Sequence, residues 1–181
     1  AEELDKTIMV ASTQVEGFFT TAWNDIYEGY RRRGKQSFMR DLIGLLVSTG
    51  WYSVFSTITA DGTKCMAEIW NPSTVYPYFD DDMIECAHMD TLNESSAKRM
   101  LIRNGWKADV RGSQKLYDLW WLDTPRTDGG WNVYNSVVLG TTLVKNPTLE
   151  TRMRRIPIFV SPTGGLPDTG YMSDDWSAEI G

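Results

Sequence analysis

The stretch from Gly50 to Met89 constrains the fold more than any other part of the sequence, because it has the pattern of strands joined by short turns. Residues 51–59 are dominated by β-branched and aromatic side chains, which suit a pleated surface. The dipeptide Asp61-Gly62 follows, and it favours the positive φ angles of a type I′ turn. A return strand over 63–70 ends at Asn71-Pro72, because proline has no N–H to donate to a sheet.

A second hairpin is predicted directly after the first. Its strands are residues 75–79 and 83–89, and the acidic turn Asp80-Asp81-Asp82 lies between them. The stretch therefore predicts two successive antiparallel hairpins. We expect the helices before and after them to pack on these strands.

The segment before the hairpins predicts an amphipathic helix. Thr13 and Glu16 have the spacing of a capping box, which indicates a helix start. Apolar residues then recur at steps of three and four, as on one buried helix face. They are Val15, Phe18, Phe19, Ala22, Trp23, Ile26, Tyr27 and Tyr30. We expect Phe19 and Trp23 to be core residues.

A second helix is predicted between two clear boundaries. Arg31, Arg32 and Arg33 suit the C-terminal end of the first helix, and Gly34 can follow it in a left-handed conformation. The second helix begins at Ser37 and ends at Gly50. The two helices should form a hairpin that leads into Trp51.

The remainder of the chain predicts one helix and three strands. Asn93 or Ser95 can cap a helix that runs to about Asn104 and stops at Gly105. The strands are expected at residues 115–123, 131–139 and 156–160. A turn rich in Pro, Asp and Gly separates the first two of them.

These elements predict an α+β fold, in which an N-terminal helical hairpin packs on a mostly antiparallel β-sheet built of successive hairpins. Residues 1–49 supply the helices, residues 50–160 form the mixed core, and the Gly/Pro-rich residues 161–181 form a connector. The chain starts without Met and ends in this Gly/Pro-rich region, so we expect it to belong to a longer protein.

Charge and hydropathy exclude some classes of protein. The net charge of −6 and the pI near 4.8 argue against a broad basic surface for sequence-independent nucleic-acid binding. No apolar run approaches the roughly 20 residues that span a bilayer, and the N-terminus lacks the pattern of a signal peptide. We expect no membrane association.

The sequence offers few residues for catalysis or metal binding. His88 is the single histidine, so a His-based metal site or a Ser-His-Asp triad has only one ring to use. The spacing of Cys65 and Cys86 is not that of metal ligands, and we favour reduced thiols over a disulfide. The acidic turn at residues 80–82 lacks the hinge glycine and distal glutamate of a calcium loop. We therefore expect no enzymatic activity and no cofactor.

The tryptophans allow two interpretations. Apart from Trp23 in the predicted first helix, they are Trp51, Trp70, Trp106, Trp120, Trp121, Trp131 and Trp176. Side chains alternate along a strand, so Trp120 and Trp121 must point to opposite faces, one buried and one exposed or at an interface. Core or interface positions are the favoured interpretation. The alternative is a stacking platform in a carbohydrate- or nucleic-acid-binding module.

Two arginine groups are candidate subunit-interface residues. They are Arg31, Arg32 and Arg33, and Arg152, Arg154 and Arg155. In an acidic protein such groups are natural partners for carboxylates of a neighbouring subunit. We expect at least one group to lie at a subunit boundary, while this chain alone stays monomeric or weakly associated.

The order of motifs resembles that of tailed-bacteriophage portal proteins. The motifs are GWYSVF, IWNPSTVYPYFDD, ECAHM, LYDLWWLD and RRIPIFVSPTGGLPD, in that order along the chain. The resemblance covers nearly the whole chain and corresponds to the wing region that precedes the stem and clip.

The resemblance implies a structural virion protein, assembled in the host cytoplasm. Portal subunits form ring homo-oligomers, dodecamers in full-length form, at one capsid vertex. The ring passes double-stranded DNA without sequence specificity during packaging and ejection. By the same resemblance, the partners are the terminase large subunit, the major capsid protein and head-tail connector proteins. A net acidic wall would suit such a conduit, because it repels DNA rather than holding it.

Overall fold

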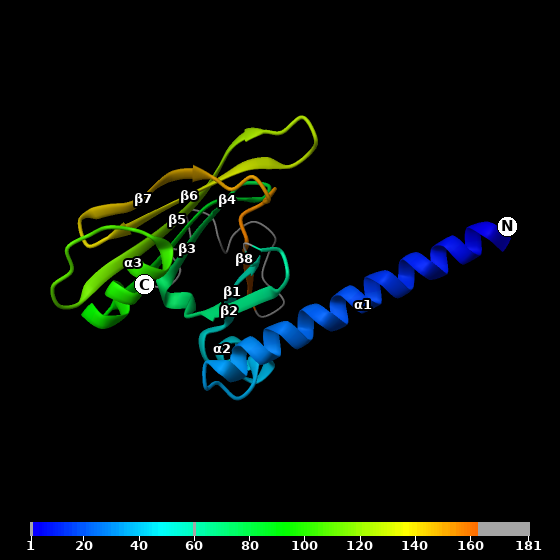
Figure 1. Ribbon diagram of the computed structural model, residues 1–181, viewed down its shortest axis with the longest axis horizontal. Coiled ribbons are helices and arrows are strands. Elements are labelled where there is room, and N and C mark those ends of the chain that lie inside the picture. Colours follow the sequence, from blue (N-terminus) through cyan, green and yellow to red (C-terminus); the bar gives the residue numbers. More distant parts are fainter. Residues whose placement is uncertain (1, 60, 163–181) are drawn as a thin grey trace.

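The computed structural model describes residues 2–59 and 61–162 (Figure 1). Helices and antiparallel sheets occur together, which confirms the predicted α+β class. The helices are α1 (Glu2–Arg32), α2 (Phe38–Thr49), η1 (Pro72–Thr74) and α3 (Glu94–Asn104). The strands are β1 (Trp51–Ile58), β2 (Cys65–Trp70), β3 (Val75–Phe79), β4 (Met83–Leu92), β5 (Gln114–Pro125), β6 (Trp131–Leu139), β7 (Thr142–Leu149) and β8 (Ile158–Pro162).

Helix α1 is longer than the sequence pattern predicted. It runs without a break from Glu2 to Arg32, so Thr13 and Glu16 lie inside it and do not cap its start. The predicted start at Thr13 was wrong, because residues 2–12 contain neither proline nor glycine and are compatible with a continuous helix.

The other two helices have the predicted boundaries. The Ser37 hydroxyl oxygen accepts a hydrogen bond from the Arg40 N–H, and Gly50 ends α2 in the left-handed region at φ 80°. In α3 the Asn93 side chain accepts from a backbone N–H of the first turn, and Gly105 supplies the left-handed stop. Polar caps and glycine stops therefore fixed these boundaries from local sequence alone.

The two predicted hairpins form, but they belong to two different sheets. Strands β1 and β2 pair with each other, and β8 joins the other edge of β1 to give the order β2-β1-β8. Strands β3 to β7 form a five-stranded antiparallel meander in chain order. The short η1 helix carries the chain from the first sheet to the second.

Two local features differ from the sequence prediction. Gly62 has φ 74°, but no described residue other than glycine has a positive φ, so Asp61-Gly62 is not a type I′ turn. Instead the Asp61 carboxylate accepts hydrogen bonds from the Thr59 hydroxyl and the Thr63 N–H, which lower the pKa of Asp61 to about 2. Strand β7 was not predicted. It contains Pro147, which is tolerated because β7 lies at the edge of the sheet.

The main core lies between the two sheets. Its buried members are Trp70, Val75, Met83, Cys86, Trp120, Val133, Ile156 and Ile158. Trp120 points into this core, whereas the neighbouring Trp121 is partly exposed on the opposite face, as the alternation of side chains predicted. Cys65 and Cys86 are both free thiols, and they belong to different sheets.

Candidate assembly surfaces and an inter-sheet groove

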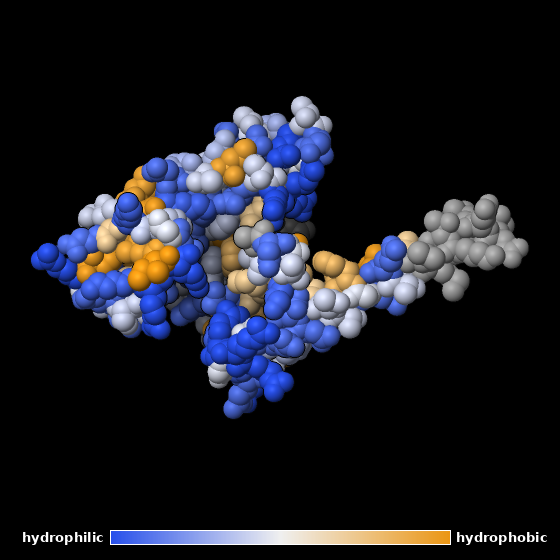
Figure 2. Space-filling view, viewed as in Figure 1, coloured by the Kyte–Doolittle hydropathy of each residue, from blue (hydrophilic) through white to orange (hydrophobic). Residues whose placement is uncertain are grey.

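Helix α1 projects from the body of the protein and exposes an aromatic stripe (Figures 1 and 2). The stripe consists of Val15, Phe18, Phe19, Trp23 and Tyr27, which are between 37% and 58% exposed. The prediction that Phe19 and Trp23 are core residues was wrong: they are 58% and 43% exposed. Helix α1 reaches α2 and β2 only near its C-terminal end, so the described part of the chain does not bury the stripe.

Polar contacts fasten the C-terminal part of α1 to the body. The Tyr30 ring is buried, and its hydroxyl donates a 2.6 Å hydrogen bond to the Asp41 carboxylate on α2. The Asp25 carboxylate accepts from the Cys65 N–H on the outer edge of β2. An edge strand has backbone groups that need partners, so α1 supplies one here and also covers the edge.

The first arginine group is divided between internal contacts and solvent. Arg33 donates to the Ala67 carbonyl on β2 and pairs with Glu68 at 3.2 Å, so it belongs to the same edge contact. Arg32 pairs with Glu28 one turn earlier in α1. Arg31 is exposed, and no ion pair is found for it among the described residues. The expectation that all three arginines point freely outward was therefore wrong for Arg33.

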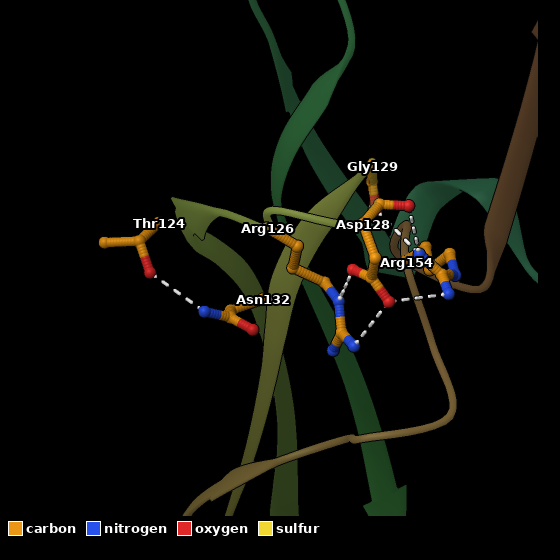
Figure 3. A network of polar contacts seen from close by, with 6 residues as sticks. All are labelled: Thr124, Arg126, Asp128, Gly129, Asn132 and Arg154. Carbon is orange, nitrogen blue, oxygen red and sulfur yellow. Dashed lines mark hydrogen bonds and ion pairs between the residues drawn. The ribbon is translucent and has the colours of Figure 1, made fainter.

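The second arginine group lies against the loop between β5 and β6 (Figure 3). Arg154 donates to the Asp128 carboxylate at 2.9 Å, and also to the backbone carbonyls of Asp128 and Gly129. Arg126 binds the same carboxylate from the other side. Together these two guanidinium groups hold the pKa of Asp128 far below its usual range.

The backbone makes an equally close contact at this position. The Trp131 N–H donates to the Arg154 carbonyl, and Gly130 has φ 76°. A Cβ on Gly130 would lie 2.8 Å from the Cβ of Arg154, closer than two such atoms can approach. Arg155 in turn pairs with Asp82 at 3.5 Å, and Arg152 also has a partner. Sequence reasoning missed these partners, because they come from distant turns.

A groove of about 910 Å³ lies between α1 with β2 on one side and α3 with the inner face of the five-stranded sheet on the other. His88 forms part of its wall, and its ring stacks on Trp70 with the ring centroids 3.9 Å apart. Burial lowers the pKa of His88, and nearby Asp90 partly opposes this effect. The stacked ring and the lowered pKa indicate that the His88 imidazole packs against Trp70 in its neutral form.

A chain of polar contacts crosses three strands and ends at the groove wall. The Lys145 ammonium donates to Glu150 and to the Asn135 side-chain oxygen, each at 2.6 Å. The Asn135 amide donates to Asp118 at 2.6 Å, and Asp118 lines the groove. Burial raises the pKa of Asp118, while the hydrogen bond from Asn135 opposes the rise. The network explains how these polar groups are accommodated within the sheet.

The outer face of the five-stranded sheet carries a row of aromatic side chains. The register aligns Tyr78, Glu85, Trp121 and Tyr134 across four neighbouring strands. The rings of Trp121 and Tyr134 stack at 5.6 Å with an interplanar angle of 14°, and Tyr78 is 44% exposed. The sequence indicated that one of Trp120 and Trp121 is exposed, but only the structure shows that it is Trp121 and which side chains are its neighbours.

Helix α3 bears a second apolar surface, at the end of the molecule opposite to α1 (Figures 1 and 2). A shallow depression of about 610 Å³ lies between α3 and the segment that follows it. Its apolar lining is Leu101, Ile102, Trp106 and Ala108, and its charged rim is Lys98, Lys107 and Asp109. Ile102 is 81% exposed. Sequence reasoning described α3 only as a surface helix and did not identify this depression.

No protein-family model matches the chain, and no curated protein matches it at a level that indicates relationship. Among the described residues, no group of three or more His, Cys, Asp and Glu side chains is placed to hold a metal ion. None of the described helices is both long enough and apolar enough to cross a membrane. Trp176 and most of the 161–181 connector lie outside the described residues.

Proposed function

We propose that this chain is a structural subunit of a ring-shaped homo-oligomer of the phage-portal type. In this proposal the ring surrounds double-stranded DNA at a capsid vertex of the virion, and it contacts terminase, capsid and head-tail connector proteins. The observation that carries the proposal is the exposed aromatic stripe of α1 (Val15, Phe18, Phe19, Trp23 and Tyr27). A helix that is anchored near its C-terminal end and carries exposed apolar side chains at residues 15–27 is suited to contact another subunit.

The size of the stripe supports a weak contact between isolated chains. Each of its five large side chains offers about 100 Å², which is half the area that an aromatic side chain buries, or roughly 500 Å² together. Stable interfaces bury about 800 Å² on each partner. The stripe alone therefore falls short, and a stable ring would need further contact area.

The test is the concentration dependence of assembly. Sedimentation velocity and light scattering on the 181-residue chain should show reversible self-association at high concentration, and the longer parent protein should form rings in electron micrographs. Replacing Phe18 and Phe19 together by Ser should abolish the association of the short chain. Val47→Ser is a matched control, because Val47 is an 80% exposed apolar residue on another helix. A chain that stays monomeric at all concentrations, with a parent that forms no ring, contradicts the proposal.

The interface role of the arginines remains a prediction. Arg31→Glu and Arg155→Glu are the sharpest tests. Arg31 has no ion pair among the described residues, and Arg155 is exposed with only a long 3.5 Å pair to Asp82. Arg33 and Arg154 have closer internal partners, whose loss would also affect folding. Either reversal should weaken self-association at low salt more than at high salt. Equal association of both variants and the wild type across salt concentrations would show that these arginines are only solvated.

A binding module is the second candidate function, and the aromatic row on the outer sheet face favours it. Exposed Glu85 lies in register between Tyr78 and Trp121. A carboxylate between aromatic rings suits sugar hydroxyls and disfavours phosphate. Titration with neutral oligosaccharides should then change Trp fluorescence in the wild type but not in Trp121→Ala. The absence of any change with either oligosaccharide or single-stranded DNA counts against this candidate.

A further inference from the structure

We propose that the exposed stripe of α1 docks into the α3 depression of the next copy of this chain. This inference rests on the proposed function, since it requires the chains to associate. It adds which two surfaces meet. The occupant of each surface is therefore a second copy of the same chain.

The positions of the two surfaces favour this contact. In Figure 1, α1 extends from one end of the molecule and α3 lies at the opposite end. A ring requires a heterologous interface, in which one surface of each subunit meets a different surface of the next. Two unlike surfaces at opposite ends satisfy this requirement, and each copy can then use both at once.

The chemistry of the two surfaces is complementary. The α3 depression has an apolar floor that includes the exposed Ile102, and this floor can receive the aromatic stripe of α1. Residues 94–111, which form α3 and the rim, contain five basic and two acidic residues. Residues 11–30 of α1 contain three acidic residues and no basic residue. Opposite charges around an apolar contact orient the partners and exclude the reverse arrangement.

Pairing of two α1 helices is the main competing arrangement, and two observations disfavour it. Near its C-terminal end, the apolar side of α1 is already covered, because Tyr30 and Phe38 are buried against each other and β1 and β2. A pair of α1 helices would also be isologous, so it would close as a dimer and leave the α3 depression uncovered.

Photo-crosslinking identifies the contact directly. Phe19 is replaced by benzoylphenylalanine, which keeps an aromatic side chain on the stripe, and this chain is mixed with an isotopically labelled copy. After irradiation, mass spectrometry should find the label-bearing crosslinked peptides within residues 94–111. The same replacement at Phe159, which is 62% exposed on β8, is the matched control and should give a different set of peptides.

Charge reversal provides an independent test. Changing Lys98 and Lys107 to Glu should weaken self-association about tenfold, which corresponds to about 1.4 kcal/mol. A partner chain that carries Glu16→Lys, a change within the stripe segment of α1, should restore part of the association. The chains could still associate while position 19 crosslinks to another α1, crosslinks to the sheet face or gives no crosslink. Any of these results overturns this inference but leaves the proposed function intact. No association at all, in the chain or its parent, removes both.

Discussion

The contact between Gly130 and Arg154 allows a sharp prediction, because a neighbouring glycine serves as its control. Gly129 and Gly130 both have positive φ angles, 90° and 76°. A Cβ at position 129 would meet no atom within 4 Å, whereas one at position 130 would lie 2.8 Å from the Arg154 Cβ and 3.0 Å from the Arg154 carbonyl oxygen. Both alanine variants therefore suffer the backbone strain, but only Gly130→Ala also displaces Arg154.

The magnitudes separate the two variants. An L-residue in the left-handed region costs about 1–2 kcal/mol, which is the expected loss for Gly129→Ala. Overpacking costs typically 1–3 kcal/mol more, so Gly130→Ala should lose about 2–5 kcal/mol in total. Urea denaturation followed by Trp fluorescence measures both free energies of unfolding. Equal losses would refute the reasoning, and they would mean that Arg154 does not rest on this loop and is available to a neighbouring subunit.

Three further predictions follow from burial and from two shifted pKa values. Trp120→Ala should lower the free energy of unfolding by about 3–5 kcal/mol, whereas Trp121→Ala should cost much less, because only the first ring is buried in the core. NMR titration should place the pKa of Asp61 near 2. Because this folded-state pKa lies below the unfolded value of about 4, ionised Asp61 stabilises the fold above about pH 4. This stabilisation is lost as the pH falls toward about 2. Iodoacetamide at pH 8 should modify Cys65 before Cys86, because burial raises the pKa of the Cys86 thiol to about 12. Peptide mass spectrometry measures the order of modification, and the reverse order would contradict this prediction.

Sequence reasoning recovered the elements whose ends are set by local chemistry. Ser37 and Asn93 are polar caps, and Gly50 and Gly105 are left-handed stops, so α2 and α3 could be placed closely. The start of α1 had no such signal, because residues 2–12 continue a helix without a break. Strand β7 was not predicted. Its proline is acceptable only at a sheet edge, and edge position is a property of the whole sheet.

The candidate surfaces were recovered only in part. The periodicity of α1 identified one apolar face correctly, but it could not tell a buried face from an exposed one, so Phe19 and Trp23 were placed in the core. Likewise, the spacing of the arginines indicated two basic groups. It could not reveal that Asp128, Asp82 and Glu68 reach them from other strands and turns.

The sequence by itself determined the α+β class, the two hairpins and the alternation that sends Trp120 and Trp121 to opposite faces. These follow from steric and hydrogen-bonding preferences that act over a few residues. The tertiary structure alone decided that the two hairpins join different sheets, that β8 returns to pair with β1, and that α1 is left half uncovered. The physical reason is that strand pairing and burial depend on which distant surfaces meet, and a side-chain pattern specifies that a face is apolar without specifying what covers it.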